Sequence, residues 1–235
     1  LDLSNNIALT YLGVTNCHLT SLNISNNINL TDLWCYNNQL TNLDISNNTA
    51  LTFLHTSMNL LTTLNVSNNT ALTWLDCANN QLTSLDVSNN TALTNFHCYG
   101  NMITSLDVSN NATLYNFHCG SNQLTILDIR NGNNMGDFIS INNLNLYCID
   151  VDDPVWSTTN WTNIDSWSSF SLNCATALGC TDSLAFNYNP LATIDDSTCI
   201  YQMTYIPDDA FENYLETNGM GNGILNDDSV LTANI

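Results

Sequence analysis

Residues 64–84 read LNVSNNTALTWLDCANNQLTS, and this stretch decides the fold because close copies of it stand on either side. The pattern returns every 21 residues over six copies without insertion or deletion, and a degenerate seventh copy follows at Leu127. The six copies begin at Leu1, Leu22, Leu43, Leu64, Leu85 and Leu106. Self-similarity at a period of about 20–29 residues is typical of a solenoid of stacked coils. We therefore expect an extended surface and no enclosed active site.

Three columns of the aligned copies are apolar: the ninth, twelfth and nineteenth positions, which hold Leu72, Leu75 and Leu82 in the quoted unit. They are expected to point inward, because one coil cannot bury its own hydrophobic face whereas stacked neighbours can. The seventeenth position is Asn in five of the six copies, as at Asn80. A buried Asn has two donors and an acceptor, which suits it to pair with backbone groups.

Cysteine fills the fourteenth position in four copies. These residues are Cys35, Cys77, Cys98 and Cys119. A free cysteine behaves as a small hydrophobe, and strands about 4.8 Å apart would stack the thiols into a ladder. Disulfides between parallel side chains on one face rarely reach the required torsion. A metal site is the alternative, and packing is the interpretation that we favour.

The unit Leu72-Thr-Trp-Leu-Asp-Cys-Ala-Asn-Asn-Gln-Leu82 resembles bacterial leucine-rich repeats. Its length and its cysteine column are similar to the internalin-J-like cysteine-ladder repeats of surface adhesins. The resemblance covers residues 1–147 and implies a leucine-rich-repeat solenoid, mostly β, with a parallel concave sheet and little helix. It is specific for the fold and weak for the ligand, because the ligand-facing columns vary freely within the family.

The chain is strongly acidic, with a single Lys or Arg, which is Arg130, against 21 Asp and Glu and a net charge of −20. Such a chain lacks the basic surface that nucleic acid or an anionic membrane would require, so neither is an expected partner. A surface suited to high salt or calcium is one interpretation of the charge, and plain solubility is the other. No run of 18 apolar residues predicts a membrane span.

The composition changes after Leu127, and we expect residues 148–175 to leave the repeat and cap the solenoid. Trp156, Trp161, Trp167 and Phe170 supply enough bulk to cover an open coil end. This segment resembles the C-terminal caps of large secreted proteins of the Bacteroidota. An aromatic platform for sugars is the alternative use of the three tryptophans.

Residues 176–202 resemble a short Cys-flanked module of secreted Bacteroidota proteins. So short a segment needs a covalent staple. The four downstream cysteines allow three pairings. Pairing Cys148 with Cys174 and Cys180 with Cys199 fits the segment boundaries best. Disulfides imply an oxidising setting, so we expect a secreted or cell-surface protein.

The same module gathers oxygen-bearing side chains that suit Ca²⁺. The candidate metal residues are Asp182, Asn187, Asp195 and Asp196. The spacing of an EF-hand is missing, and Asp and Asn are also ordinary turn residues. Calcium is the one possible cofactor that the sequence indicates.

The final segment, 203–235, contains a predicted helix over Ile206–Glu216 with Pro207 at its start. It resembles the N-terminal helical cap of a following repeat domain, with residues 231–235 opening a new first repeat. The chain is therefore interpreted as one link of a longer secreted protein.

In each short strand the residues on either side of the buried leucine are expected to line the concave face. The candidate ligand-binding residues are Tyr11, Trp34, Tyr36, Phe53, His55, Trp74, Asp76, His97, Tyr99 and His118. Aromatic residues gathered on a surface indicate a partner, although Trp and Tyr also favour strands on their own account. His97 and His118 occupy neighbouring coils and form a second candidate metal pair.

Two functions fit these observations. The first is a non-enzymatic adhesion or binding segment whose concave aromatic face meets a protein or glycan on another cell, or copies of itself. The alternative is a structural link of an extracellular fibre with no dedicated ligand. Catalysis is not expected, because no nucleophile–base pair or paired carboxylates have a pocket to lie in.

Overall fold

The computed structural model describes residues 1–185, 187–189, 192–201, 203–205, 209–219 and 229–231. The chain divides into two compact units, Leu1–Asn173 and Cys174–Ile235. Each unit is described separately.

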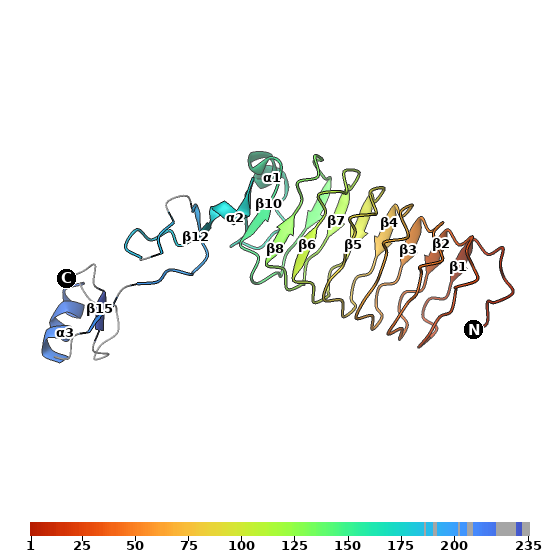
Figure 1. The fold of residues 1–235 in the computed structure, drawn as a ribbon, viewed down its shortest axis with the longest axis horizontal. Helices are drawn as coiled ribbons and strands as arrows, with labels where there is room; N and C mark the ends of the chain where they lie inside the picture. The colour runs from red at the N-terminus through yellow and green to blue at the C-terminus, as the bar shows by residue number, and fades with distance from the viewer. Residues whose placement is uncertain (186, 190–191, 202, 206–208, 220–228, 232–235) are drawn as a thin grey trace. The chain divides into compact units, whose positions relative to one another are not determined.

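The first unit is built on a sheet of seven parallel strands with the order β1-β2-β3-β4-β5-β7-β9. Neighbouring strands pair residues 21 apart, as at Leu54 and Leu75, so each coil adds one strand (Figure 1). The strands are β1 Tyr11–Gly13, β2 Asp32–Trp34, β3 Phe53–His55, β4 Trp74–Asp76, β5 Asn95–His97, β7 Asn116–His118 and β9 Asp137–Ile139.

A second parallel sheet of four strands, in the order β11-β10-β8-β6, forms in the later coils. Its strands are β6 Ser105–Asp107, β8 Ile126–Asp128, β10 Cys148–Asp150 and β11 Ser169–Ser171. Asp128 pairs with Asp150, which lies 22 residues further on, and Cys148 then pairs with Ser169 at a spacing of 21. Strand pairing in the second sheet thus continues through Ser171, within the segment 148–175 that was expected to leave the repeat and cap the solenoid.

The predicted apolar columns form the core. The twelfth-position residues from Leu33 to Phe138 have at most 2% of their surface exposed, and Phe96 stacks on Phe117 with ring centroids 5.5 Å apart. Cys35, Cys77, Cys98 and Cys119 are free and fully buried, which confirms packing as the role of the cysteine column. Burial raises the pKa of Cys35 to about 11 and the pKa of Cys77 well above its usual value, so these side chains stay neutral.

The predicted asparagine column satisfies backbone groups between coils. The side-chain amide of Asn80 donates to the backbone oxygens of Thr56 and Cys77 at 3.1 and 3.0 Å, and its Oδ1 accepts from the N–H of Leu61 at 3.0 Å. Each coil from the second to the sixth is thus bound to the coil before it through the side-chain amide of an asparagine.

A second buried asparagine column was missed in the sequence. Asn69 donates to the backbone oxygens of Ile45 and Asn48 at 3.1 and 2.8 Å. The equivalent buried residues in other coils are Asn27, Asn48, Asn90 and Asn111. The signal was present in the second Asn of each Ser-Asn-Asn, because that residue never varies among the six copies.

The end of the solenoid is covered by α1 (Pro154–Asn160) and the residues after it. Asp153 caps this helix by accepting from the N–H groups of Val155 and Trp156 at 3.0 Å. Trp161 is 5% exposed, lies 5.0 Å from Phe138 and donates from Nε1 to the oxygen of Met135. The burial of Trp161 supports a role in covering the end of the solenoid over a role in sugar binding. Trp167 differs, because 43% of its surface is exposed.

The described residues of the second unit contain little regular structure. Its elements are α2 Cys174–Ala177, β12 Leu178–Gly179, β13 Ile194–Asp195, β14 Met203–Tyr205, α3 Asp209–Thr217 and β15 Ser229–Leu231. Strands β12 and β13 are parallel, and β14 and β15 are antiparallel. Helix α3 confirms the predicted helix from Asp209 onward, whereas Pro207 and residues 232–235 lie outside the described residues.

Candidate functional site: the outer face of the seven-stranded sheet

The strands of the seven-stranded sheet present two side chains each to one face, because the middle residue of every three-residue strand is buried. We call this the outer face, and it is the face that the sequence predicts to be concave. Eight of the ten candidate binding residues lie in these strands. Tyr36 and Tyr99 follow β2 and β5 by two residues. The structure thus brings the candidates together, and their binding role stays a prediction.

Three aromatic rings on this face form a continuous stack, which we call the aromatic row: Trp34, Phe53 and Trp74. The ring centroids of Trp34 and Phe53 are 4.4 Å apart with 17° between planes, and those of Phe53 and Trp74 are 5.4 Å apart with 19°. Tyr36 stacks beside the row on His55 at 4.5 Å. The stacking covers both faces of Phe53 and one face of each tryptophan.

The indole nitrogens of the aromatic row are enclosed. Nε1 of Trp34 and Nε1 of Trp74 are both buried, and neither has a hydrogen-bond partner among the described residues. A buried N–H without a partner lowers stability, and tryptophan is usually enriched where its N–H meets one. The two enclosed N–H groups therefore lower the stability of the fold, and folding alone does not account for the two tryptophans at these positions.

A second group, the histidine–aspartate strip, lies beside the aromatic row and consists of His55, Asp76, His97, His118 and Asp137. Asp76 is 9% exposed, and its Oδ2 lies 3.3 Å from His55 Nε2 and 3.8 Å from His97 Nδ1. Its Oδ1 accepts from the N–H of Ala78 at 3.0 Å. The ring of His97 stacks on that of His118 at 4.5 Å, and His118 Nε2 lies 2.8 Å from Asp137 Oδ2.

Burial is the main influence on the protonation of His55. It lowers the pKa of the imidazole, Asp76 acts in the opposite direction, and His97 lowers the pKa further. Asp137 was missed among the candidates because it lies in the degenerate seventh copy. Extending the column of Asn95 and Asn116 by 21 residues would have found it.

The only lysine or arginine of the chain lies elsewhere, on the second sheet. Arg130 donates from Nε to Asp128 Oδ1 at 2.9 Å and from Nη1 to the oxygen of Leu172 at 3.2 Å. It borders a hollow of about 500 Å³ together with Asp107, Ile126 and Asp150. The outer face consequently carries carboxylates with no arginine or lysine to neutralise them.

Solved structures with the same architecture are leucine-rich-repeat proteins. The chain is similar to the functional domain of InlJ from Listeria monocytogenes, described as including a cysteine ladder, with 35% identity and a TM-score of 0.57 over 64% of this chain and 36% of that one. It is similar to the internalin InlF of Listeria monocytogenes at 23% identity and a TM-score of 0.52, covering 69% and 55%. The leucine-rich-repeat domain of APL1B gives 19% identity and a TM-score of 0.53, covering 68% and 56%.

The chain folds as a leucine-rich-repeat solenoid. The predicted fold class is confirmed, and the buried cysteine column corresponds to the ladder described for InlJ. The chain spans between about a third and just over half of the length of these proteins. No family model and no curated protein matches it.

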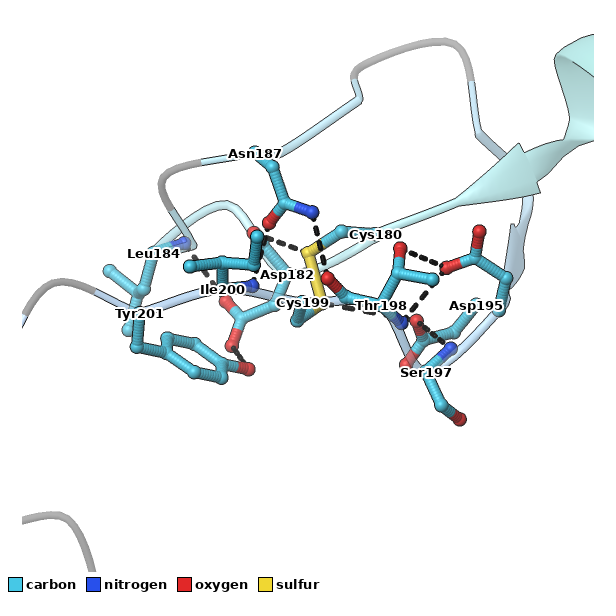
Figure 2. Close-up of a disulfide and its surroundings, with 11 residues drawn as sticks. Cys180, Asp182, Leu184, Asn187, Asp195, Ser197, Thr198, Cys199, Ile200 and Tyr201 are labelled. Carbon is cyan, nitrogen blue, oxygen red and sulfur yellow. Dashed lines mark hydrogen bonds between the residues drawn. A yellow bond between two sulfur atoms is a disulfide. The ribbon is translucent and has the colours of Figure 1, made fainter.

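The stapled module after the solenoid contains the predicted calcium ligands, and its turns already use their oxygens (Figure 2). Asp182 accepts from the N–H of Leu184 at 2.9 Å and from the hydroxyl of Tyr201 at 2.8 Å. Asn187 accepts from the N–H of Ile200 at 2.7 Å. Asp195 and Asp196 accept from the N–H groups two residues ahead, Ser197 and Thr198. These contacts support the turn-residue interpretation, and calcium binding stays a prediction for calorimetry to test.

Metal binding by the histidines or the cysteine ladder also finds little support. Within the described parts of the chain, three or more His, Cys, Asp or Glu side chains never group in a way that could hold a metal ion.

The predicted staple is confirmed, since Cys180 and Cys199 form a disulfide, and Cys148 and Cys174 are disulfide-bonded as well.

Proposed function

We propose that this leucine-rich-repeat solenoid is a non-enzymatic binding module that holds a partner protein against its outer face. The aromatic row is the observation that carries the proposal, because three large, partly exposed rings stack across adjacent strands of one sheet. Trp and Tyr are over-represented among the residues that dominate binding energy at protein interfaces. The proposal assigns that role to Trp34, Phe53 and Trp74.

The scaffold beneath the row supports a binding role because it is rigid. The residues between the outward side chains, such as Leu54 and Leu75, are fully buried, and the strands pair without a break from β1 to β9. A preformed surface loses little conformational freedom on binding, so more of the contact energy appears as affinity. The solved structures that resemble the chain are leucine-rich-repeat domains, which favours binding over catalysis.

We propose an extracellular setting for this module. The Cys180–Cys199 disulfide and the disulfide-bonded Cys148 and Cys174 are favoured in oxidising compartments. Among the described residues, no helix has the length and apolar character needed to cross a membrane. Adhesion by a secreted or surface-held protein is the role that combines these features with the outer face.

A direct test is binding of the purified chain to a panel of immobilised cell-surface and matrix protein domains, measured by biolayer interferometry. A variant with Trp34→Ala, Phe53→Ala and Trp74→Ala is compared with a control carrying Ile126→Ala, Val155→Ala and Leu172→Ala, whose parent side chains are 60–80% exposed away from the outer face. We expect the first variant to lose at least about tenfold in affinity for any partner found, and the control to keep it. Equal affinity for both variants would reject the outer face as the binding site.

A further inference from the structure

The outer face has a marked imbalance of charge. Asp32, Asp76 and Asp137 lie in β2, β4 and β9, and the only Lys or Arg of the chain lies on the second sheet. Asp137 retains 49% exposure of its side chain although it contacts His118. With neutral imidazoles the face is therefore negative, and charge complementarity favours a cationic group on the partner.

The three histidines of the strip lie among these carboxylates. His55 on β3 faces Asp76 on β4, with Trp34 and Tyr36 on its other side. His97 on β5 faces Asp76 and Trp74 on β4 and His118 on β7, and His118 also faces Asp137 on β9. Tyr99 and the buried thiols of Cys77 and Cys98 complete the titratable neighbours of Asp76, and burial raises the pKa of all three.

Acidification works against the negative charge of the strip. Its two carboxylates, Asp76 and Asp137, lie against three imidazoles, and each proton that an imidazole takes up makes the strip more positive by one charge. Histidine is the side chain that ordinarily changes charge between about pH 5 and pH 8.

We propose that the histidine–aspartate strip recognises a lysine or arginine side chain of the partner protein at neutral pH and releases it on acidification. The proposal rests on the proposed function, because the strip borders the aromatic row and would share its partner. The exposed carboxylate of Asp137 offers the first contact to the incoming cation. The stacked rings of His97 and His118, 4.5 Å apart, place two imidazoles beside that contact.

The geometry of the aromatic row favours a protein over a glycan as the partner that carries the cationic group. Sugars pack on the open face of an aromatic ring and hydrogen-bond to accessible donors. In this row the stack covers both faces of Phe53 and one face of each tryptophan, and Nε1 of Trp34 and of Trp74 is enclosed. Ring edges flanked by carboxylates suit aliphatic side chains interspersed with basic ones. The expected occupant is thus an extended basic and apolar segment of a protein.

The test uses a capped peptide of alternating leucine and arginine, a matched leucine–glutamate peptide and a linear glucose oligosaccharide, with the whole chain and at constant low salt. Binding is measured by tryptophan fluorescence and calorimetry at about pH 7.5 and about pH 5.5. Three proteins are compared: the wild type, a variant with His55→Gln, His97→Gln and His118→Gln, and a control with His18→Gln, whose side chain is exposed outside the strip.

We expect the arginine peptide to bind wild type at about pH 7.5 and to lose at least about tenfold in affinity at about pH 5.5, whereas the triple variant changes less than about twofold. The control should respond like wild type. The proposal is overturned if the arginine peptide fails to bind, if the triple variant keeps the full pH response, or if the glutamate peptide or the oligosaccharide binds better at neutral pH. A partner that binds through the aromatic row with no pH dependence would reject only this inference and leave the proposed function intact.

Discussion

The rings of Trp34 and Phe53 lie face to face on adjacent strands, with centroids 4.4 Å apart and 17° between their planes. These residues occupy different columns of the repeat, so the contact runs diagonally across the sheet. Stacked aromatic pairs contribute about 0.5–1.5 kcal/mol beyond the area that they bury. A double-mutant cycle with Trp34→Leu and Phe53→Leu should give a coupling free energy in this range by urea unfolding. Strictly additive losses would show that the rings do not stabilise each other.

The buried amide of Asn80 should be far more important for stability than the exposed amide of Asn89. Replacing Asn80 with Ala leaves the N–H of Leu61 without its side-chain acceptor. It also removes one of the two asparagine donors to each of the oxygens of Thr56 and Cys77, where Asn59 and Asn101 remain. We expect a loss of about 2–4 kcal/mol in the free energy of unfolding. Asn89→Ala is the matched control, for which we expect a loss within about 0.5 kcal/mol. Similar losses for the two variants would contradict the structural role of the column.

The free cysteines should differ sharply in reactivity. Cys17 is exposed, whereas Cys35, Cys77, Cys98 and Cys119 are buried. Burial raises the pKa of the thiol to about 11 for Cys35 and also raises the pKa of the other three thiols, and only the thiolate reacts readily. Alkylation of the native chain followed by mass spectrometry should modify Cys17 alone, and unfolding should expose all five. Rapid modification of Cys98 in the native chain would mean that the ladder opens to solvent.

Acid should destabilise the solenoid through His55. Burial lowers the pKa of His55 in the folded chain, whereas the unfolded imidazole has its ordinary pKa of about 6.5. The unfolded chain therefore binds more protons below about pH 6.5, so the free energy of unfolding falls as the pH drops from there through the lower folded pKa. Urea unfolding at several pH values should show a smaller acid loss in His55→Gln than in wild type. His18→Gln serves as control, and an equal loss in His55→Gln would assign the effect to other groups.

The sequence was sufficient to predict the solenoid because its core columns recur at a fixed spacing. Leu75 and Asn80 are constrained by contacts with the coils before and after them, and those contacts are visible as repetition. The second asparagine column was equally repetitive, but it was missed because residues such as Asn69 look like ordinary turn residues. The extra residue between Asp128 and Asp150 was hidden by the loss of repetition after residue 127.

The outer face was predicted only as a set of residues. Alternation along the strands indicates that Trp34, Phe53 and His55 point the same way, but it does not fix their rotamers. The stack of the aromatic row and the position of Asp76 between two imidazoles depend on how each side chain turns toward its neighbour. Such contacts follow from three-dimensional packing and leave no periodic signal in the chain.

Binding of a protein partner to the outer face should depend on the aromatic row. Affinity for the same immobilised partner is measured for wild type, for the variant with Trp34→Ala, Phe53→Ala and Trp74→Ala, and for the control with Ile126→Ala, Val155→Ala and Leu172→Ala. Circular dichroism and urea unfolding first establish that all three proteins are folded. We expect at least about a tenfold loss of affinity for the aromatic-row variant and an unchanged affinity for the control. Undiminished binding by the folded aromatic-row variant would show that the partner does not bind through these rings.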